Sequence, residues 1–187
     1  FIRNRLHFFW HLSKYQGDID WQAVKADGVE YAFVRLGIRG YGSGKIVLDE
    51  NFADNMQGAN EAGVKAGVYF FTQAVTVEEA QEEAAFVIEN LAEYDVPYPV
   101  VFDVEMITGQ DGRANNLTMQ ERTDITVAFC EAVKAAGYTP MIYGNVKCFT
   151  KMMDMLTVRM RNGMPFMISI CISLMRSVCG SIRKKAQ

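Results

Sequence analysis

The sequence predicts an α/β fold built on a parallel sheet. Between Asp18 and Asn145 one theme repeats: an amphipathic helix, a glycine and then a short apolar strand. A glycine just past a helix adopts positive φ easily, and so frees the chain to turn into the next strand. The theme occurs as Gly28 before residues 29–35, Gly63 before residues 64–71 and Gly137 before residues 138–143. Strands that alternate with helices form parallel sheets with right-handed crossovers.

Five strands are expected, each a short apolar run rich in β-branched and aromatic residues. They cover residues 8–12, 31–36, 66–71, 100–104 and 141–143. Two of the intervening helices start at sequences typical of capping boxes, Thr76 with Glu79 and Thr118 with Glu121. We expect these helices to end near Leu91 and Ala136. A stripe at helical spacing in the first of them is expected to pack in the core: Ala80, Ala84, Val87, Ile88 and Leu91.

The β/α pattern is expected to stop near Asp154, where the sequence changes character. Residues 155–187 contain six basic residues and no acid, together with five of the eleven methionines. We therefore divide the chain into a main domain, residues 1–154, and an atypical basic, Met-rich tail, residues 155–187, which we hypothesise to be frameshifted or non-native. A complete eight-stranded β/α barrel needs ~250 residues, with roughly 200 near the lower limit. A chain of 187 residues predicts a barrel that is incomplete at its C-terminal end.

Composition narrows the class of protein. The chain is 50% hydrophobic and 22% charged, as in soluble globular domains, and its net charge of −3 gives no case for nucleic-acid binding. Residues 164–179 are apolar but shorter than the roughly 20 residues of a spanning helix, so no integral membrane span is expected. Residues 1–10 lack the cleavage site of a signal peptide. The four cysteines have no zinc-ligand spacing, and Cys130 fits a helical core position.

The most informative segment is residues 99–105, an apolar run that leads to Asp103 and Glu105. Successive strand side chains point to opposite faces, so these two carboxylates share a face at the carboxyl end of a strand, where α/β folds place their chemistry. Two carboxyl groups this close do not titrate independently, and glycosidases use such pairs. The alternative is structural: Asp103 caps the next loop and Glu105 pairs with a Lys or Arg.

Six segments occur in the order of a known family. They read Ser13-Lys-Tyr-Gln-Gly17-Asp-Ile-Asp-Trp21, Phe33-Val-Arg35, Asp49-Glu-Asn-Phe52-Ala-Asp-Asn55, Gly67-Val-Tyr69-Phe-Phe71, Asp103-Val-Glu105 and Ile142-Tyr143-Gly-Asn145. Together they resemble the family 25 glycoside hydrolases, the Chalaropsis-type lysozymes of bacteria and phages. The resemblance implies a flattened, TIM-like β/α barrel. It also implies cleavage of the β-1,4 bond between N-acetylmuramic acid and N-acetylglucosamine in peptidoglycan.

The resemblance also implies roles for individual residues. Glu105 matches the family's proton donor, and Asp103 matches the residue that stabilises positive charge or orients the acetamido group of the substrate. The implied substrate-binding residues are Arg35, Tyr69, Phe71, Tyr143, Asn145 and His11. For the aromatic residues the alternative is packing in the barrel core. Arg35 is expected to pair with Asp103 or Glu105, because burying an unpaired guanidinium is costly. No metal or other cofactor is required.

Two features depart from the family. The first strand reads Phe9-Trp10-His11-Leu12-Ser13 where the family has Gly-Ile-Asp-Val-Ser, so His11 stands in place of an active-site Asp. A charged imidazole lowers the pKa of a neighbouring Glu and makes it a poorer acid at neutral pH. Alternatively, residues 1–11 are not native to this domain. The family's last strands, with a Trp-Gln-Tyr-type segment, are absent, which predicts self-association through the unclosed edge.

Two other functions stay open at this point. A module that binds peptidoglycan glycan strands without cleaving them accounts for His11 and the missing strands. An unrelated α/β enzyme has less support. Residues 37–44 are rich in glycine, but their spacing matches neither a P-loop nor a dinucleotide fingerprint, and we expect them to form a loop on the catalytic face. A cell-wall substrate implies an extracellular or cell-wall-associated location.

Overall fold

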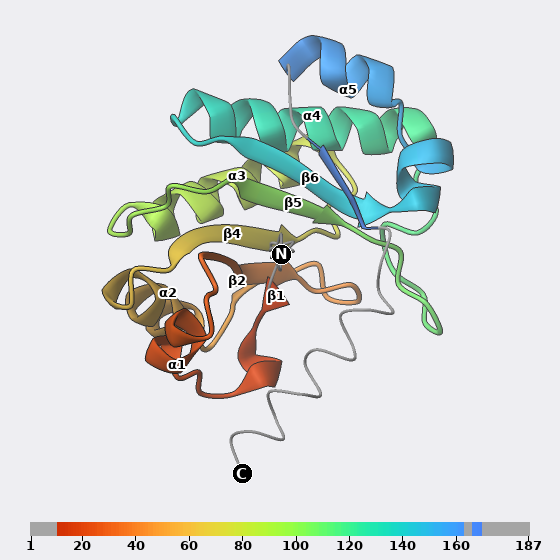
Figure 1. The fold of residues 1–187 in the computed structure, drawn as a ribbon. Coiled ribbons are helices and arrows are strands. Elements are labelled where there is room, and N and C mark those ends of the chain that lie inside the picture. The colour runs from red at the N-terminus through yellow and green to blue at the C-terminus, as the bar shows by residue number, and fades with distance from the viewer. Residues whose placement is uncertain (1–10, 163–165, 170–187) are drawn as a thin grey trace, which may run out of the picture.

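A parallel β-sheet organises the computed structural model, which describes residues 11–162 and 166–169 (Figure 1). Within them the strand order is β1-β2-β4-β5-β6-β7, with every neighbouring pair parallel, and β3 pairs antiparallel with β2. The predicted α/β class and parallel sheet are confirmed. The strands are β1 (His11–Leu12), β2 (Tyr31–Arg39), β3 (Ile46–Leu48), β4 (Lys65–Phe71), β5 (Val100–Val104), β6 (Pro140–Asn145) and β7 (Phe166–Ser169).

The helices follow the capping signals in the sequence. They are α1 (Trp21–Ala26), α2 (Phe52–Glu61), α3 (Val77–Leu91), α4 (Met119–Ala135) and α5 (Met155–Asn162), with short turns at Lys14–Gln16 and Cys148–Met152. The capping box of Thr118 and Glu121 is complete at the start of α4. Thr76 caps α3 by accepting from the Glu79 N–H, but the Glu79 carboxylate bonds the Val75 N–H instead of closing a box.

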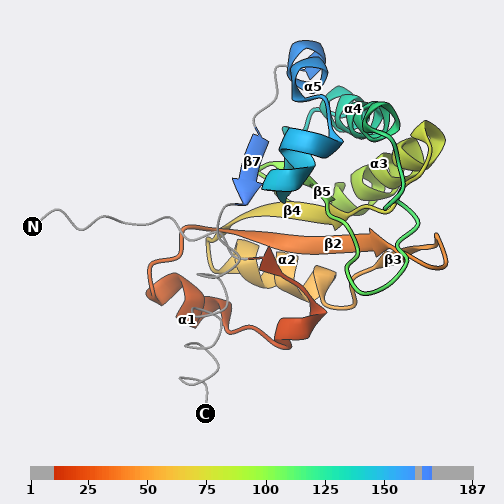
Figure 2. The ribbon, with the colours of Figure 1, turned by 90° about the vertical axis from the view of Figure 1, so that its right-hand side faces the viewer.

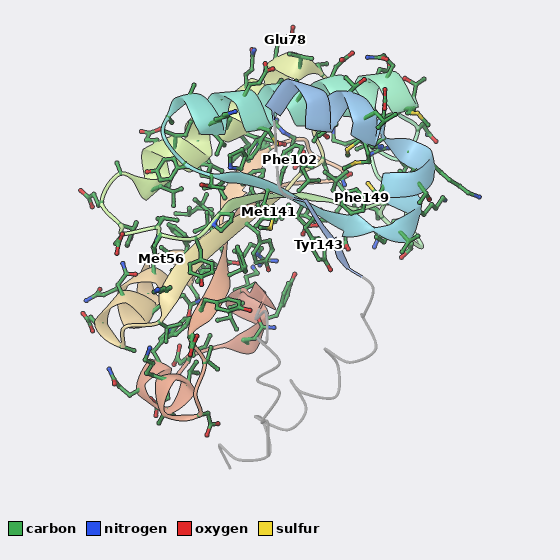
Figure 3. The ribbon with its side chains drawn as sticks, turned by 45° about the horizontal axis from the view of Figure 1, so that its top comes forward. Met56, Glu78, Phe102, Met141, Tyr143 and Phe149 are labelled. Atoms are coloured by element: carbon green, nitrogen blue, oxygen red, sulfur yellow. The ribbon has the colours of Figure 1, made fainter. Side chains whose placement is uncertain are left out.

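The two faces of the sheet pack differently. Side chains such as Val34, Phe70 and Phe102 join helix residues in the main core, where Phe102 stacks on Phe129 of α4 with 4.2 Å between ring centroids. The predicted stripe on α3 lies in this core. On the opposite face, four buried residues form a separate cluster to which no described helix contributes: Phe33, Tyr69, Val101 and Tyr143. Figure 3 shows Phe102 toward the helices and Tyr143 away from them.

One glycine on β4 makes room for this second cluster. A Cβ on Gly67 would lie 2.5 Å from the Phe33 ring and 2.8 Å from the Pro99 carbonyl oxygen. A larger residue would therefore push the Phe33 ring away from the sheet.

The strands of the sheet follow one another in a single direction. In doubly wound sheets the strand order reverses at a switch point, whereas here spatial order follows chain order from β1 to β7. Right-handed crossovers then place the helices on one face, as in β/α barrels. Among the described residues β1 and β7 are the two ends of the sheet and do not pair with each other. The described strands therefore form an open sheet.

Two expectations about the chain are wrong. Residues 37–39 are not part of a loop but continue β2 and pair with residues 46–48 of β3, so that only residues 40–45 turn. The β/α alternation also does not stop at Asp154, because α5 and β7 follow, and β7 pairs with β6. Met and Arg, which occur in this segment, are less typical of the apolar strand and helix pattern of the preceding units, and this explains the wrong expectation. Residues 8–10 and 170–187 lie outside the described residues.

Candidate active site

The carboxyl ends of β4, β5 and β6 bring three of the predicted site residues into one row. Phe71, Asp103 and Tyr143 are direct partners in the parallel register. Arg35 and Tyr69 pair in the row two residues earlier, next to Val101. Because side chains two apart on a strand share a face, these residues all lie on the face of the Tyr69 and Tyr143 cluster.

Asp103 is a buried carboxyl group with an unsatisfied oxygen. The residue is only 6% exposed, and its Oδ1 has no hydrogen-bond partner among the described residues. Burial raises the pKa of Asp103 well above its ordinary value, and the neighbouring Glu105 raises it further, whereas Arg35 acts to lower it. A buried polar atom without a partner is rare in folded proteins and marks a position of interest.

Glu105 lies directly after β5 and is half-buried. Burial raises the pKa of this carboxyl as well. The main-chain carbonyl of Glu105 accepts a hydrogen bond of 3.3 Å from Gln73 Nε2. The two carboxyl groups are thus close enough to influence each other, one buried and one at the end of the strand. Such a pair retains a proton to higher pH than an isolated carboxyl and can act as an acid.

Arg35 does not pair with Asp103 or Glu105, so that expectation is wrong. Its Nε donates to Oδ2 of Asp49 at 2.7 Å, and the guanidinium lies 5.1 Å from the centre of the Tyr15 ring. Asp49, whose side chain is fully buried, also accepts from the main-chain N–H of Lys14 and of Asn51. The sequence indicated that Arg35 needs a carboxylate partner. The partner is Asp49, which lies just after the β2–β3 hairpin, and this hairpin was not predicted.

The remaining predicted site residues are placed as follows. Tyr69 and Tyr143 are buried, and burial raises the pKa of the Tyr69 hydroxyl. Phe71 is half-buried at the end of β4. Asn145 ends β6, and its Oδ1 accepts from the Cys148 N–H at 3.0 Å. His11 pairs with Phe33 through the main chain of β1, and the structure does not describe its side chain.

Sequence reasoning missed two polar residues beside the site. Gln73 is fully buried next to Glu105, and Glu83 is fully buried and bonded to Arg39 at 2.7 Å and Thr72 at 2.8 Å. A signal existed for both. Gln73 follows a strand at its carboxyl end, and Glu83 interrupts the apolar stripe of α3 at a core position.

Among the described residues, no group of three or more His, Cys, Asp or Glu side chains is placed to hold a metal ion. None of the helices in the described part of the chain has the length and apolar character to cross a membrane.

Comparison with known proteins decides the family. Residues 11–166 match the family described as Glycosyl hydrolases family 25. The chain belongs to this family. The match extends beyond residue 154 into α5 and reaches the first residue of β7, in agreement with the continued β/α alternation.

Several lysozymes and autolysins resemble the chain. The autolytic lysozyme of Clostridium acetobutylicum is 28% identical over 95 residues, which is 51% of this chain and 27% of that protein. The modular autolysin LytC of Streptococcus pneumoniae is 26% identical with a TM-score of 0.65, over 75% of this chain and 32% of that one. The bacterial lysozyme of Streptomyces coelicolor shares the fold at 19% identity, with a TM-score of 0.59 over 84% and 70% of the two chains.

Proposed function

We propose that this chain is a peptidoglycan hydrolase of the lysozyme type that cleaves the β-1,4 bond between N-acetylmuramic acid and N-acetylglucosamine. The observation that carries the proposal is the pair of carboxyl groups at the carboxyl end of β5, the buried Asp103 and the half-buried Glu105. Family membership and the names of the related lysozymes support it. The chain spans about a third or less of the length of the autolytic lysozyme and of LytC.

In the proposed mechanism Glu105 is the acid. It gives its proton to the glycosidic oxygen as the bond from that oxygen to the anomeric carbon breaks, which leaves positive charge on the sugar. Asp103 stabilises this charge or holds the acetamido group of the substrate, and the acetamido oxygen then forms a bond to the anomeric carbon. In the second step water attacks the same carbon, the bond to the acetamido oxygen breaks, and the water gives a proton back to Glu105. The raised pKa of Glu105 favours this role, since an acid must still hold its proton at the working pH.

The other predicted residues are proposed to form the substrate side of the site. The half-buried Phe71 is proposed to meet a sugar face, and the buried Tyr69 and Tyr143 are proposed to line the same face of the sheet. We assign Asn145 and His11 to the same side of the sheet. Arg35 is proposed to contribute to this side of the site while it is held by its ion pair with Asp49.

The proposal extends to fold, location and partners. The open sheet corresponds to part of a flattened β/α barrel, whose winding it shares. The substrate places the protein outside the cell or at the cell wall, with peptidoglycan glycan strands as its partner. Self-association through an edge of the open sheet is a further expectation, because unpaired strand edges are templates for pairing. That residues 155–187 are frameshifted or non-native stays a hypothesis, which reading the coding sequence in its other two frames would test.

The test is release of muropeptides from purified peptidoglycan, followed by mass and reducing-end analysis. Glu105→Gln removes the proton and keeps the shape, and we expect it to lower release by about 10²–10⁴-fold. Glu89→Gln, an exposed carboxyl on α3, is the matched control and should leave release unchanged. Products that end in muramic acid identify the bond. Binding of peptidoglycan without any release by the wild type would instead favour the module that binds without cleaving.

A further inference from the structure

Gln73 connects the loop after β4 to the residue after β5. Gln73 is fully buried, and both the nitrogen and the oxygen of its side-chain amide make hydrogen bonds. Nε2 donates to the main-chain carbonyl of Glu105 at 3.3 Å, and Oε1 accepts from the main-chain N–H of Ala114 at 3.5 Å. A buried amide with partners at both ends fixes the groups it joins, since losing either bond leaves a desolvated polar atom.

The segment between these two contacts is the long connection from β5 to α4. Arg113 anchors it a second time, because its guanidinium donates to the main-chain oxygen of Gln73 at 3.3 Å and to both oxygens of Glu79 at 2.8 and 3.0 Å. The N–H of Arg113 also donates to the Tyr41 carbonyl at 3.2 Å. Figure 2 shows this connection descending beside the β2–β3 hairpin. The connection is thus fixed by β4, α3 and the hairpin.

The end of β4 holds both carboxyl residues by their main chains. The Thr72 N–H donates to the Asp103 carbonyl at 3.1 Å, and Gln73 repeats this contact for Glu105 with its side chain. Val104 is the last residue of β5 paired with β6, opposite Gly144, so the Gln73 amide takes over where that strand pairing ends. We propose that Gln73 is a positioning residue that sets the orientation of Glu105 relative to Asp103 through the Glu105 main-chain carbonyl. This inference rests on the proposed function, in which Glu105 donates the proton.

Positioning of this kind affects the chemical step more than binding. Gln73 is buried behind the main chain of Glu105, so its replacement changes where the carboxyl points and leaves the sugar-facing side chains in place. Misplacing a reacting group by about 1 Å costs on the order of 10²-fold in rate. For Gln73→Met, which keeps the volume and loses both hydrogen bonds, we expect kcat to fall about 10–100-fold with KM within about twofold.

The experiment compares four full-length chains in muropeptide release and in a carboxyl titration by ¹³C NMR, with the Glu105 signal assigned from its loss in Glu105→Gln. The chains are wild type, Gln73→Met, Gln73→Glu and Gln57→Met. Gln73→Glu keeps the oxygen that faces Ala114 and replaces the amide donor, so it tests the Glu105 contact if Gln73→Met does not fold. Gln57 is exposed on α2, where its amide bonds Glu61, and is the matched control.

The proposal predicts that both Gln73 variants lose kcat and that Gln57→Met does not. In Gln73→Met the Glu105 titration and the alkaline limb of the kcat profile both move to lower pH, because the carboxyl becomes more exposed. A folded Gln73→Met chain with the wild-type kcat and the wild-type Glu105 titration would overturn the proposal. If no chain releases product but the Glu105 titration still differs between wild type and Gln73→Met, the positioning stands and the proposed function fails.

Discussion

Two buried carboxyl groups lie near the ends of neighbouring strands in opposite circumstances. Glu83 of α3 has a partner for each oxygen, Arg39 Nε at 2.7 Å and the Thr72 hydroxyl at 2.8 Å. Asp103 of β5 has no partner for Oδ1 in the described part of the chain, and the charged group that most affects it is another acid, Glu105. Burial raises the pKa of both, to about 7 for Glu83, but only at Glu83 do hydrogen bonds to the charged form work against this rise.

The difference separates a structural carboxyl group from a candidate catalytic one. A buried oxygen without a hydrogen-bond partner does not stabilise the fold. Its presence on Asp103 beside a second acid therefore makes Asp103 a candidate for a chemical role. A paired group such as Glu83 joins elements together. Its contacts connect β2 through Arg39, the end of β4 through Thr72, and α3. The two groups should therefore respond in opposite ways to replacement.

The largest effect is expected for activity at Asp103. Asp103→Asn keeps the shape of the side chain and removes the negative charge that the proposed mechanism requires beside the anomeric carbon. Release of muropeptides should fall about 10²–10⁴-fold, comparable to the loss of a general acid or base. The folded fraction at neutral pH should not decrease. A variant that loses activity only in proportion to its folded fraction would place Asp103 among structural residues such as Glu83.

The same substitution should change the pH dependence of stability. The pKa of Asp103 is raised in the folded state, so as pH rises above about 4 the unfolded chain ionises first and the free energy of unfolding falls until the folded-state pKa is passed. Asp103→Asn lacks this loss. Urea unfolding at pH 3 to 8 should show equal stability at the acid end and a variant more stable than the wild type at the alkaline end. Parallel curves would contradict the raised pKa.

Glu83 should behave in the opposite sense. Glu83→Ala leaves Arg39, itself only 3% exposed, without its most buried partner, although Glu82 and the Gly44 carbonyl still accept from it. Removing one partner of a buried ion pair costs about 3–5 kcal/mol. Urea unfolding at neutral pH measures the loss, and Glu89→Ala on the exposed side of the same helix should change it by less than about 0.5 kcal/mol. Equal effects of the two substitutions would mean that the Glu83 contacts contribute little.

Much of the fold could be predicted because its signals are local. Glycines with positive φ at residues 28, 63 and 137, the caps Thr76 and Thr118, and the apolar runs of β4 and β5 all mark their elements within a few residues. The β2–β3 hairpin was missed because glycines at positions 37, 40, 42 and 44 suggest a loop, whereas Gly37 is in β2 for a steric reason. A Cβ there would lie 2.6 Å from the Val47 carbonyl oxygen.

The candidate site was predicted only in part, because half of it depends on contacts between distant residues. Asp103 and Glu105 could be found from their spacing on one strand. The partner of Arg35 could not, because the choice among Asp49, Asp103 and Glu105 is made by the hairpin. Gln73 reaches Glu105 across 32 residues, and no local pattern reports such a contact. Burial of polar residues in otherwise apolar stretches was the available signal, and it indicates a partner without identifying it.

The smallest expected effect tests whether Thr72 belongs with Glu83. Thr72→Val keeps the shape but leaves Glu83 Oε2 without its donor and the Ala74 N–H without its acceptor, for a loss of about 1–2 kcal/mol. Thr150→Val, at an exposed position, should cost less than about 0.5 kcal/mol. Because the Thr72 hydroxyl lowers the pKa of Glu83, its removal should raise that pKa above about 7 and extend the fall of stability to higher pH.

In a Glu83→Ala background Thr72→Val should cost less than it does alone, since the contact that joins the two residues is already lost. Fully additive losses would show that Thr72 stabilises the end of β4 without Glu83, and that the paired carboxyl group is held by Arg39 alone.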